Sequence, residues 1–379
     1  MNYVKVIDEI FKQFDGQKFS VKLWDGKTRH YGSGKISAFS LIIKNPNTVQ
    51  RLLSQGSLGF GESYMDGSLQ IKGDIEAYLK LRHQVKHIRK SWRMILAKLL
   101  SDRTVPKDRK SQISYHYDLG NDFFKLILDN KTMMYSSARY ENGSETLAKA
   151  QENKLKLISE WLNLPKNADI LDLGSGWGGF AIYAAKIFRW NITGFTLSSK
   201  QLEYSQNLVK KTKLHKFISF YERDMTKPLS RKKYDGILVL EAIEHVGQES
   251  LATFFKELKK ALKPGAPLII QTTGRYQFKR VDRWTLKYVF PGGYIPTKDE
   301  LFKHAIDAGF TIENFRDDTS DYIYTISEWI RNLEKNQPKI EKMFDAPFFK
   351  LWYLWMHGAK VNFEIGDMSL FRIKMSTPI

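Results

Sequence analysis

Residues 170–180 limit the possible folds of this chain more than any other stretch. They read Ile-Leu-Asp-Leu-Gly-Ser-Gly-Trp-Gly-Gly-Phe, so a short apolar run typical of a strand meets Asp172 and then closely spaced glycines. An apolar, Ala-rich segment typical of a helix follows. Glycines are needed where a backbone turns sharply and a ligand lies against it without a Cβ in the way. Strand, glycine turn and helix predict the first unit of a nucleotide-binding α/β sheet.

The residues around this turn narrow the choice of ligand, although the turn alone also fits a simple tight strand–helix connection. No Lys-Ser or Lys-Thr pair follows the glycines, which excludes a phosphate-binding P-loop. The next predicted strand ends in Thr196-Leu197-Ser198, where a dinucleotide enzyme would place an acid for the ribose. The Asp-x-Gly-x-Gly-x-Gly form resembles motif I of class I methyltransferases, whose ligand is S-adenosylmethionine.

Strand and helix patterns alternate through the rest of this region. Apolar strand candidates at 217–222, 234–240 and 268–273 are separated by helical segments, which predicts an α/β fold with a doubly wound, mostly parallel, Rossmann-like sheet. Ligands bind such sheets at the carboxyl ends of the strands. The long aromatic segment 274–297 is predicted as an insertion covering that edge. Residues 369–375 are predicted to return as an edge strand.

The length of 379 residues allows two domains. Residues 1–100 mix strand and helix signals and predict a smaller α+β domain, in which the glycine-rich stretch 59–67 is interpreted as loop and turn. The polar, proline-containing stretch 101–112 is the predicted linker. Residues 113–379 are the predicted methyltransferase domain.

The net charge of +19 is concentrated near the end of the first domain, where residues 80–110 hold 11 basic and 2 acidic residues. Residues 82–100 predict a basic amphipathic helix, which indicates either a polyanionic partner (an anionic membrane surface or nucleic acid) or a solvated face. The absence of cysteine excludes disulfides, zinc–thiolate sites and a cysteine nucleophile. No metal site is predicted. Without a signal peptide or a membrane span, we expect a cytoplasmic protein that associates peripherally with the membrane.

Several ordered motifs resemble the cyclopropane-fatty-acyl-phospholipid synthases, across essentially residues 110–379. The N-terminal part is also similar to the lipid-associated domain of the longer bacterial members, through Leu23-Trp-Asp-Gly and residues 61–67. The other motifs are His116-Tyr-Asp-Leu-Gly-Asn-Asp-Phe-Phe124, Met134-Tyr-Ser-Ser-Ala, residues 171–179, Gly194-Phe-Thr-Leu-Ser198, Glu244-His-Val-Gly247 and 288–296.

The resemblance implies transfer of the methyl group of S-adenosylmethionine to the cis double bond of unsaturated acyl chains in membrane phospholipids. A carbocation would then close to a cyclopropane ring. The implied partners are an anionic phospholipid surface and the acyl chain. No nucleic acid partner is expected, and a homodimer is left open. The implied cofactor-binding residues are Tyr117, Ser136, Gly174, Gly176, Thr196, Gln201, Asp224 and Met225.

The resemblance also implies a bicarbonate ion as proton acceptor. The implied catalytic residues are the Glu244 and Tyr322 side chains and the backbone of Ser137 and Thr273. Gln271 stands where the family has a histidine. It brings a hydrogen-bond donor without a positive charge, so a methylene- or methyl-branched product stays an alternative to the ring, with the ring favoured.

Two other functions are left open at this point. A class I methyltransferase acting on RNA or a small molecule would suit the positive charge, but the apolar stripe of residues 82–100 and the acyl-pocket motifs favour lipid. A non-enzymatic lipid-binding protein is suggested by Ser137, Gln271 and Ala359, which depart from the family pattern.

Overall fold

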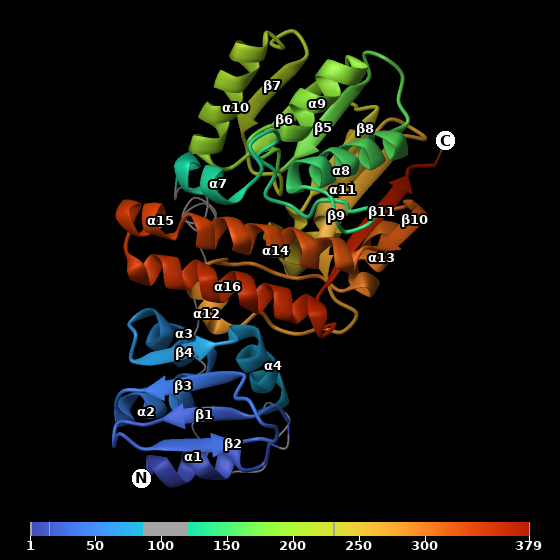
Figure 1. Cartoon of the computed structure of the whole chain (residues 1–379). Coiled ribbons are helices and arrows are strands. Elements are labelled where there is room, and N and C mark those ends of the chain that lie inside the picture. Colours follow the sequence, from blue (N-terminus) through green and yellow to red (C-terminus); the bar gives the residue numbers. More distant parts are fainter. Residues whose placement is uncertain (1, 15, 86–119, 230–231, 379) are drawn as a thin grey trace. The chain divides into compact units, whose positions relative to one another are not determined.

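The computed structural model describes residues 2–378 except 15, 86–119 and 230–231 (Figure 1). The chain forms two compact units. The first comprises the described residues up to 85 together with Asp282–Val289 and Gln337–Val361. It therefore includes two segments from the part of the chain assigned above to the methyltransferase domain. The predicted linker, and the predicted basic helix beyond residue 85, lie outside the described residues.

The second unit is built on a seven-stranded sheet that confirms the predicted α/β class (Figure 1). The strand order is β10-β11-β9-β8-β5-β6-β7, and β11 is the one strand that runs antiparallel to its neighbours. The strands are β5 (Asp169–Leu173), β6 (Asn191–Thr196), β7 (Ile218–Glu222), β8 (Gly236–Leu240), β9 (Pro267–Gly274), β10 (Thr311–Asp317) and β11 (Ser369–Ser376).

The predicted position of the last strand is wrong, because β11 lies between β9 and β10 and not at the edge. Phe371, Ile373 and Met375 are fully buried, and so is Arg372 between them. Burial of consecutive residues means that both faces of the strand are covered, as expected of an inner strand. The largely exposed β10 is the edge strand at this end of the sheet.

Helices cover both faces of this sheet and are joined to it by two apolar clusters. One cluster packs α8 (Leu147–Leu162), α9 (Gly179–Phe188) and α10 (Ser199–Thr212) on one face. The other packs α11 (Leu251–Ala261) and α13 (Lys298–Asp307) on the opposite face. The other helices in the described residues of this unit are α7 (Asn121–Ile127), α14 (Thr319–Lys335) and the 3-10 turns η1 (Ile243–His245) and η2 (Gln248–Ser250).

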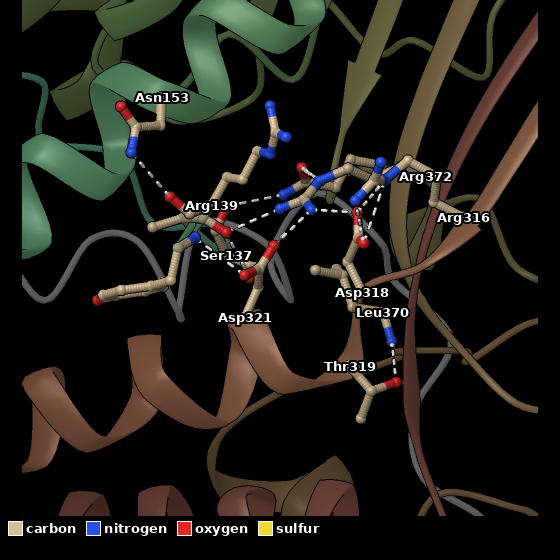
Figure 2. Close-up of polar contacts among 12 residues, drawn as sticks. Ser137, Arg139, Asn153, Arg316, Asp318, Thr319, Asp321, Leu370 and Arg372 are labelled. Carbon is tan, nitrogen blue, oxygen red and sulfur yellow. Dashed lines mark hydrogen bonds and ion pairs between the residues drawn. The ribbon is translucent and has the colours of Figure 1, made fainter. Parts of the chain in front are cut away.

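A buried arginine on β11 ties several of these elements together (Figure 2). The guanidinium of Arg372, 1% exposed, donates from Nε to Gln271 Oε1 on β9 at 2.8 Å and from one terminal nitrogen to Ala138 O at 2.7 Å. Its other terminal nitrogen pairs with Asp321 on α14 at 2.6 Å and also with Asp318. All of its hydrogen-bonding sides are therefore used to fix β9, α14 and the loop before α8.

The first unit contains a four-stranded sheet in the order β2-β1-β3-β4, in which β1 and β3 are parallel. On α16, His357 and Lys360 hydrogen-bond Glu76 of α4. Burial raises the pKa of Glu76, but these two partners outweigh burial and lower that pKa to about 2. The elements are α1 (Tyr3–Phe11), β1 (Phe19–Lys22), β2 (Thr28–Tyr31), β3 (Phe39–Ile43), α2 (Pro46–Gln55), α3 (Ser57–Met65), β4 (Leu69–Gly73), α4 (Ile75–Val85), α12 (Arg283–Tyr288), α15 (Gln337–Met343) and α16 (Ala346–Glu364).

The glycine-rich stretch 59–67 is mostly helix, so its interpretation as a loop is wrong. A Cβ at Gly61 would lie 2.1 Å from the indole of Trp284, and one at Gly59 would lie 2.2 Å from the carbonyl oxygen of Arg51. These two glycines are thus required for close packing of α3 against α12 and α2 and not for turning the chain.

We expect Arg372→Met to lower the free energy of unfolding by about 3–5 kcal/mol at pH 7, because it leaves the buried Asp321 without its cation and leaves Asp318 with Arg316 alone. Loss of the guanidinium raises the pKa of both carboxyls, so the deficit should shrink as the pH falls through the raised values. Denaturant unfolding between pH 4 and 8 measures this. The control is Arg331→Met, whose arginine is 70% exposed. An equal, pH-independent loss in both variants would contradict the expectation.

Candidate active site

A pocket lies at the carboxyl ends of β5, β6 and β8, the edge at which parallel sheets bind ligands. Its wall combines backbone of the glycine turn with apolar, aromatic and a few ionisable side chains. The lining residues are Met133, Met134, Tyr135, Ser136, Asp172, Gly174, Ser175, Gly176, Trp177, Gly179, Phe180, Phe195, Thr196, Leu197, Gln201, Arg223, Met225, Leu240, Glu241, Ala242 and His245.

The glycine turn forms the floor of this pocket. Gly174 and Gly176 have φ values of 81° and 53°, in the region that favours glycine. A Cβ at Gly174 would lie 2.3 Å from the Cβ of Ala242, whereas one at Gly176 would point into open space. Bare backbone therefore faces the pocket where a ligand can approach closely. This cradle fits S-adenosylmethionine, the cofactor implied by the resemblance.

Several of the other implied cofactor residues lie on the same wall. Thr196 donates its hydroxyl to Gln201 Oε1 at 2.8 Å, which links the end of β6 to the first turn of α10. Both residues and Met225 line the pocket. Asp224 does not line the pocket. Its Oδ1 accepts hydrogen bonds from the backbone N–H and the hydroxyl of Thr226 at 2.8 and 2.7 Å.

The segment before α8 supplies a further part of the wall. Ser136 is buried, and its hydroxyl accepts a hydrogen bond of 2.8 Å from Lys154. Burial lowers the pKa of Lys154 to about 7. At the start of α7, Asn121 accepts a 2.7 Å hydrogen bond from the indole of Trp177, which brings this helix to the pocket. Tyr117 lies outside the described residues.

The sequence analysis missed Glu241, the first residue after β8, which lines the pocket. Its Oε1 accepts from the backbone N–H of Ser137 and from the side-chain amide of Gln271, each at 2.7 Å. Its Oε2 accepts from the Tyr322 hydroxyl at 2.6 Å. Three of the implied catalytic residues thus surround a carboxylate that belongs to the chain.

Glu244, the carboxylate that the resemblance singles out, occupies a different environment. Its Oε1 accepts from the Thr273 N–H at 2.7 Å and lies 2.8 Å from the Thr272 hydroxyl, and the residue is not among those lining the pocket. Burial, helped by the negative charge of Glu241, raises the pKa of Glu244 to about 8. The five implied catalytic residues therefore divide into two groups, with Thr273 and Glu244 apart from the other three.

Burial also favours the neutral forms of two other ionisable side chains of the wall. Burial raises the pKa of Asp172 to about 7 and lowers that of His245 to about 4. The His245 ring lies 4.5 Å from the Phe290 ring, measured between centroids. Burial and the nearby Glu241 carboxylate hold the pKa of Tyr322 well above its ordinary value, so this phenol stays a donor.

We expect Glu244→Gln to make the protein more stable than the wild type at high pH. The folded chain keeps a proton on Glu244 that the unfolded chain releases between the ordinary pKa of 4.5 and the folded value of about 8. The free energy of unfolding therefore falls as the pH rises through this window. Each unit of the shift corresponds to about 1.4 kcal/mol.

Denaturant unfolding at intervals from pH 4 to 9 tests this expectation. The variant and the wild type should be nearly equal at pH 4 and diverge up to pH 8. Glu160→Gln, which removes a carboxylate with 56% of its side chain exposed, is the matched control and should show no such divergence. A constant difference across the range would refute the assignment of Glu244 as a buried, protonated acid.

Comparisons with known proteins agree with this geometry. The mycolic acid cyclopropane synthetase family matches residues 105–373, and a domain of unknown function matches residues 6–88. The chain is 30% identical to the cyclopropane-fatty-acyl-phospholipid synthase of Escherichia coli, over 88% of this chain and 87% of that protein. It is 26% identical to a probable fatty acid methyltransferase of Pseudomonas putida, over 94% and 91% of the two chains.

Solved structures share the fold. A cyclopropane synthase from Mycobacterium tuberculosis superposes with a TM-score of 0.67 at 24% identity, over 73% of this chain and 100% of that one. A coclaurine N-methyltransferase superposes equally well, with a TM-score of 0.67 at 19% identity, over 83% and 98% of the two chains. The fold alone therefore does not choose between a lipid and a small-molecule substrate.

The described residues contain no helix with the length and apolarity needed to cross a membrane. The family match and the nearly full-length relative confirm the predicted enzyme class, an S-adenosylmethionine-dependent methyltransferase. The chain belongs to the mycolic acid cyclopropane synthetase family, which with its relatives comprises cyclopropane synthases and related lipid methyltransferases.

Proposed function

We propose that the enzyme transfers the methyl group of S-adenosylmethionine to the cis double bond of unsaturated acyl chains in membrane phospholipids, forming a cyclopropane ring. The observation that carries the acyl-phospholipid part is the match to the E. coli synthase over 88% of this chain, which is too long to be confined to the unit that contains the seven-stranded sheet. The bound donor supplies an electrophilic methyl group. The protein must position both substrates and stabilise the positive charge that forms on the acyl chain after methyl transfer.

The glycine cradle supports the choice of methyl donor. A mycolic acid cyclopropane synthase that shares the fold, with a TM-score of 0.67, was solved with SAH and CTAB. In this chain Gly174, Gly176, Thr196 and Gln201 would hold the donor, because they combine close backbone approach with polar groups at the ends of β5 and β6. Met225 adds an apolar surface on the same wall.

The aromatic side of the pocket supports chemistry through a cation. Tyr135, Trp177, Phe180 and Phe195 line it, and Tyr135 packs against Trp329 with 5.0 Å between ring centroids. Aromatic faces attract positive charge, and their bulk excludes the water that would otherwise capture a carbocation. These residues therefore suit an alkene that becomes a cation when it accepts a methyl group.

The net charge of +19 supports a peripheral role at an anionic phospholipid surface, where this substrate is found. A methylene- or methyl-branched acyl chain is the second candidate product. It is favoured by relatives such as the sphingolipid C9-methyltransferase of Candida albicans, 27% identical over 83% of this chain and 64% of that protein. Whether the cation closes to a ring or loses its proton after rearrangement depends on where the proton acceptor lies.

We expect Gly174→Ala to weaken S-adenosylhomocysteine binding at least tenfold, because its Cβ would lie 2.3 Å from the Cβ of Ala242 and its φ of 81° disfavours any side chain. Isothermal titration calorimetry measures the affinity. Gly16→Ala is the control, since its Cβ meets nothing within 4 Å. Unchanged affinity in a folded Gly174→Ala protein would show that the cofactor does not bind against this turn.

We expect labelled methyl groups to enter phospholipid only when vesicles contain unsaturated chains, and turnover to rise with the fraction of anionic lipid. Methyl-labelled S-adenosylmethionine, vesicles of saturated or unsaturated phospholipid, and competing RNA provide the comparison. Mass and fragmentation analysis of the released fatty acids separates ring, methylene and methyl products. Incorporation into saturated lipid, or inhibition by RNA at matched charge, would contradict the proposed substrate.

A further inference from the structure

The Glu241 carboxylate is held against the pocket by hydrogen bonds from three neutral donors. The backbone of Ser137, the amide of Gln271 and the hydroxyl of Tyr322 reach it at 2.7, 2.7 and 2.6 Å. Such donors fix a carboxylate in place, facing the pocket, without pairing it with a positive charge.

The same three donors are already used by Glu241 and are not free to bind a separate small anion. The resemblance assigns bicarbonate to the backbone of Ser137 and Thr273 and to Gln271, Tyr322 and Glu244. Glu241 already binds three of these groups, those of Ser137, Gln271 and Tyr322. The N–H of Thr273 donates instead to Glu244 at 2.7 Å. A carboxylate has the planar O–C–O shape and the single negative charge of bicarbonate. A free ion would have to displace the chain's own side chain from all three donors.

The orientation of Gln271 is fixed from behind. Because a guanidinium only donates, Arg372 binds the amide oxygen of Gln271 at 2.8 Å and forces its NH2 group to point forward. That nitrogen then donates to Glu241 and, at 3.0 Å, to the carbonyl oxygen of Ser137.

The backbone of Glu241 is strained to hold this position. Its φ is 52°, in the left-handed region that favours glycine, and its N–H donates to the carbonyl oxygen of Gln271 at 2.6 Å. Of the six non-glycine residues with positive φ in the described part of the chain, Glu241 and Met133 line the pocket. Strain of this kind persists where the side chain serves a function.

The two carboxyls of this region have different environments. Burial and the neighbouring Glu241 charge raise the pKa of Glu244 to about 8, so Glu244 is mainly a neutral acid at pH 7. Glu241 is the one that faces the pocket. Where two carboxyls share a site and differ in this way, they take different roles.

We infer that the Glu241 carboxylate is the proton acceptor of this enzyme, in the place of an external anion; this rests on the proposed methyl transfer to an alkene. One alkene carbon would bond the methyl group as the methyl–sulfur bond of the donor breaks and S-adenosylhomocysteine leaves with that electron pair, and the neighbouring carbon would become a carbocation. Glu241 accepts a proton from that methyl group, and the released C–H pair forms the bond that closes the ring. The resulting carboxylic acid returns its proton to solvent.

The test compares wild type with Glu241→Gln and Glu241→Gly in carbonate-free buffer, with labelled S-adenosylmethionine and unsaturated phospholipid vesicles. We expect wild-type turnover to be unchanged by added bicarbonate. Glu241→Gln should lose roughly 10²–10⁴-fold in turnover with unchanged S-adenosylhomocysteine affinity. Glu241→Gly, whose backbone suits a φ of 52°, should be inactive until formate or bicarbonate is added.

A readout without turnover follows binding of ¹³C-bicarbonate by NMR line broadening. We expect broadening with Glu241→Gly and none with wild type. Glu160→Gln is the matched control and should behave as wild type in every measurement. No labelled lipid from wild type under any condition would refute the proposed function itself.

With active wild type, three results would overturn the inference alone. These are a requirement of the wild type for bicarbonate, ¹³C-bicarbonate bound to wild type, or at least a third of the wild-type rate in Glu241→Gln. Should Glu241→Gln fail to fold, Glu241→Gly decides, and activity independent of added anion in that variant would also overturn the inference.

Discussion

The contact between the Arg372 guanidinium and the Gln271 amide is the interaction on which the rest of the site depends. It exists because β11 enters the sheet between β9 and β10, so that an arginine of the last strand faces a glutamine of β9. Gln271 can present only one end of its amide to a group that has no acceptor. The NH2 end of the amide must therefore donate to Glu241. Arg372, which lies behind Gln271, thus determines that Gln271 presents a donor to the pocket wall.

This arrangement links Arg372 to the Glu241 carboxylate through Gln271, without a direct ion pair between the two. Arg372 is neutralised by Asp318 and Asp321, and only a hydrogen bond passes through Gln271 to the Glu241 carboxylate. A directly paired cation would hold the carboxylate in its charged form and make it a weaker base. A neutral glutamine at position 271 is therefore suited to hold the carboxylate of Glu241, which is already fixed to the chain. A charged side chain there would be suited to bind a free anion.

The sequence predicted the parts of the fold that depend on local pattern. Apolar strands separated by helices, and glycines after Leu173, were sufficient for the sheet and its ligand edge. Pairings between distant segments were not predictable in this way. Gly59 and Gly61 have turn-like composition, but the indole that requires Gly61 comes from Trp284, more than two hundred residues later. Strand order is equally non-local, so β11 was predicted to lie at an edge.

Glu241 shows the same limit at the site. Two glutamates follow β8, and a motif favours the second, Glu244, because it stands beside a histidine and a glycine in a fixed pattern. The position of Glu241 at the carboxyl end of an inner strand was a signal in the sequence that could have identified it as a site residue. The deciding facts are a φ of 52° and donors from β9, α14 and the loop before α8. A glycine would satisfy that backbone without strain, so a glutamate at this position, with its carboxylate in the pocket wall, favours a role for that carboxylate.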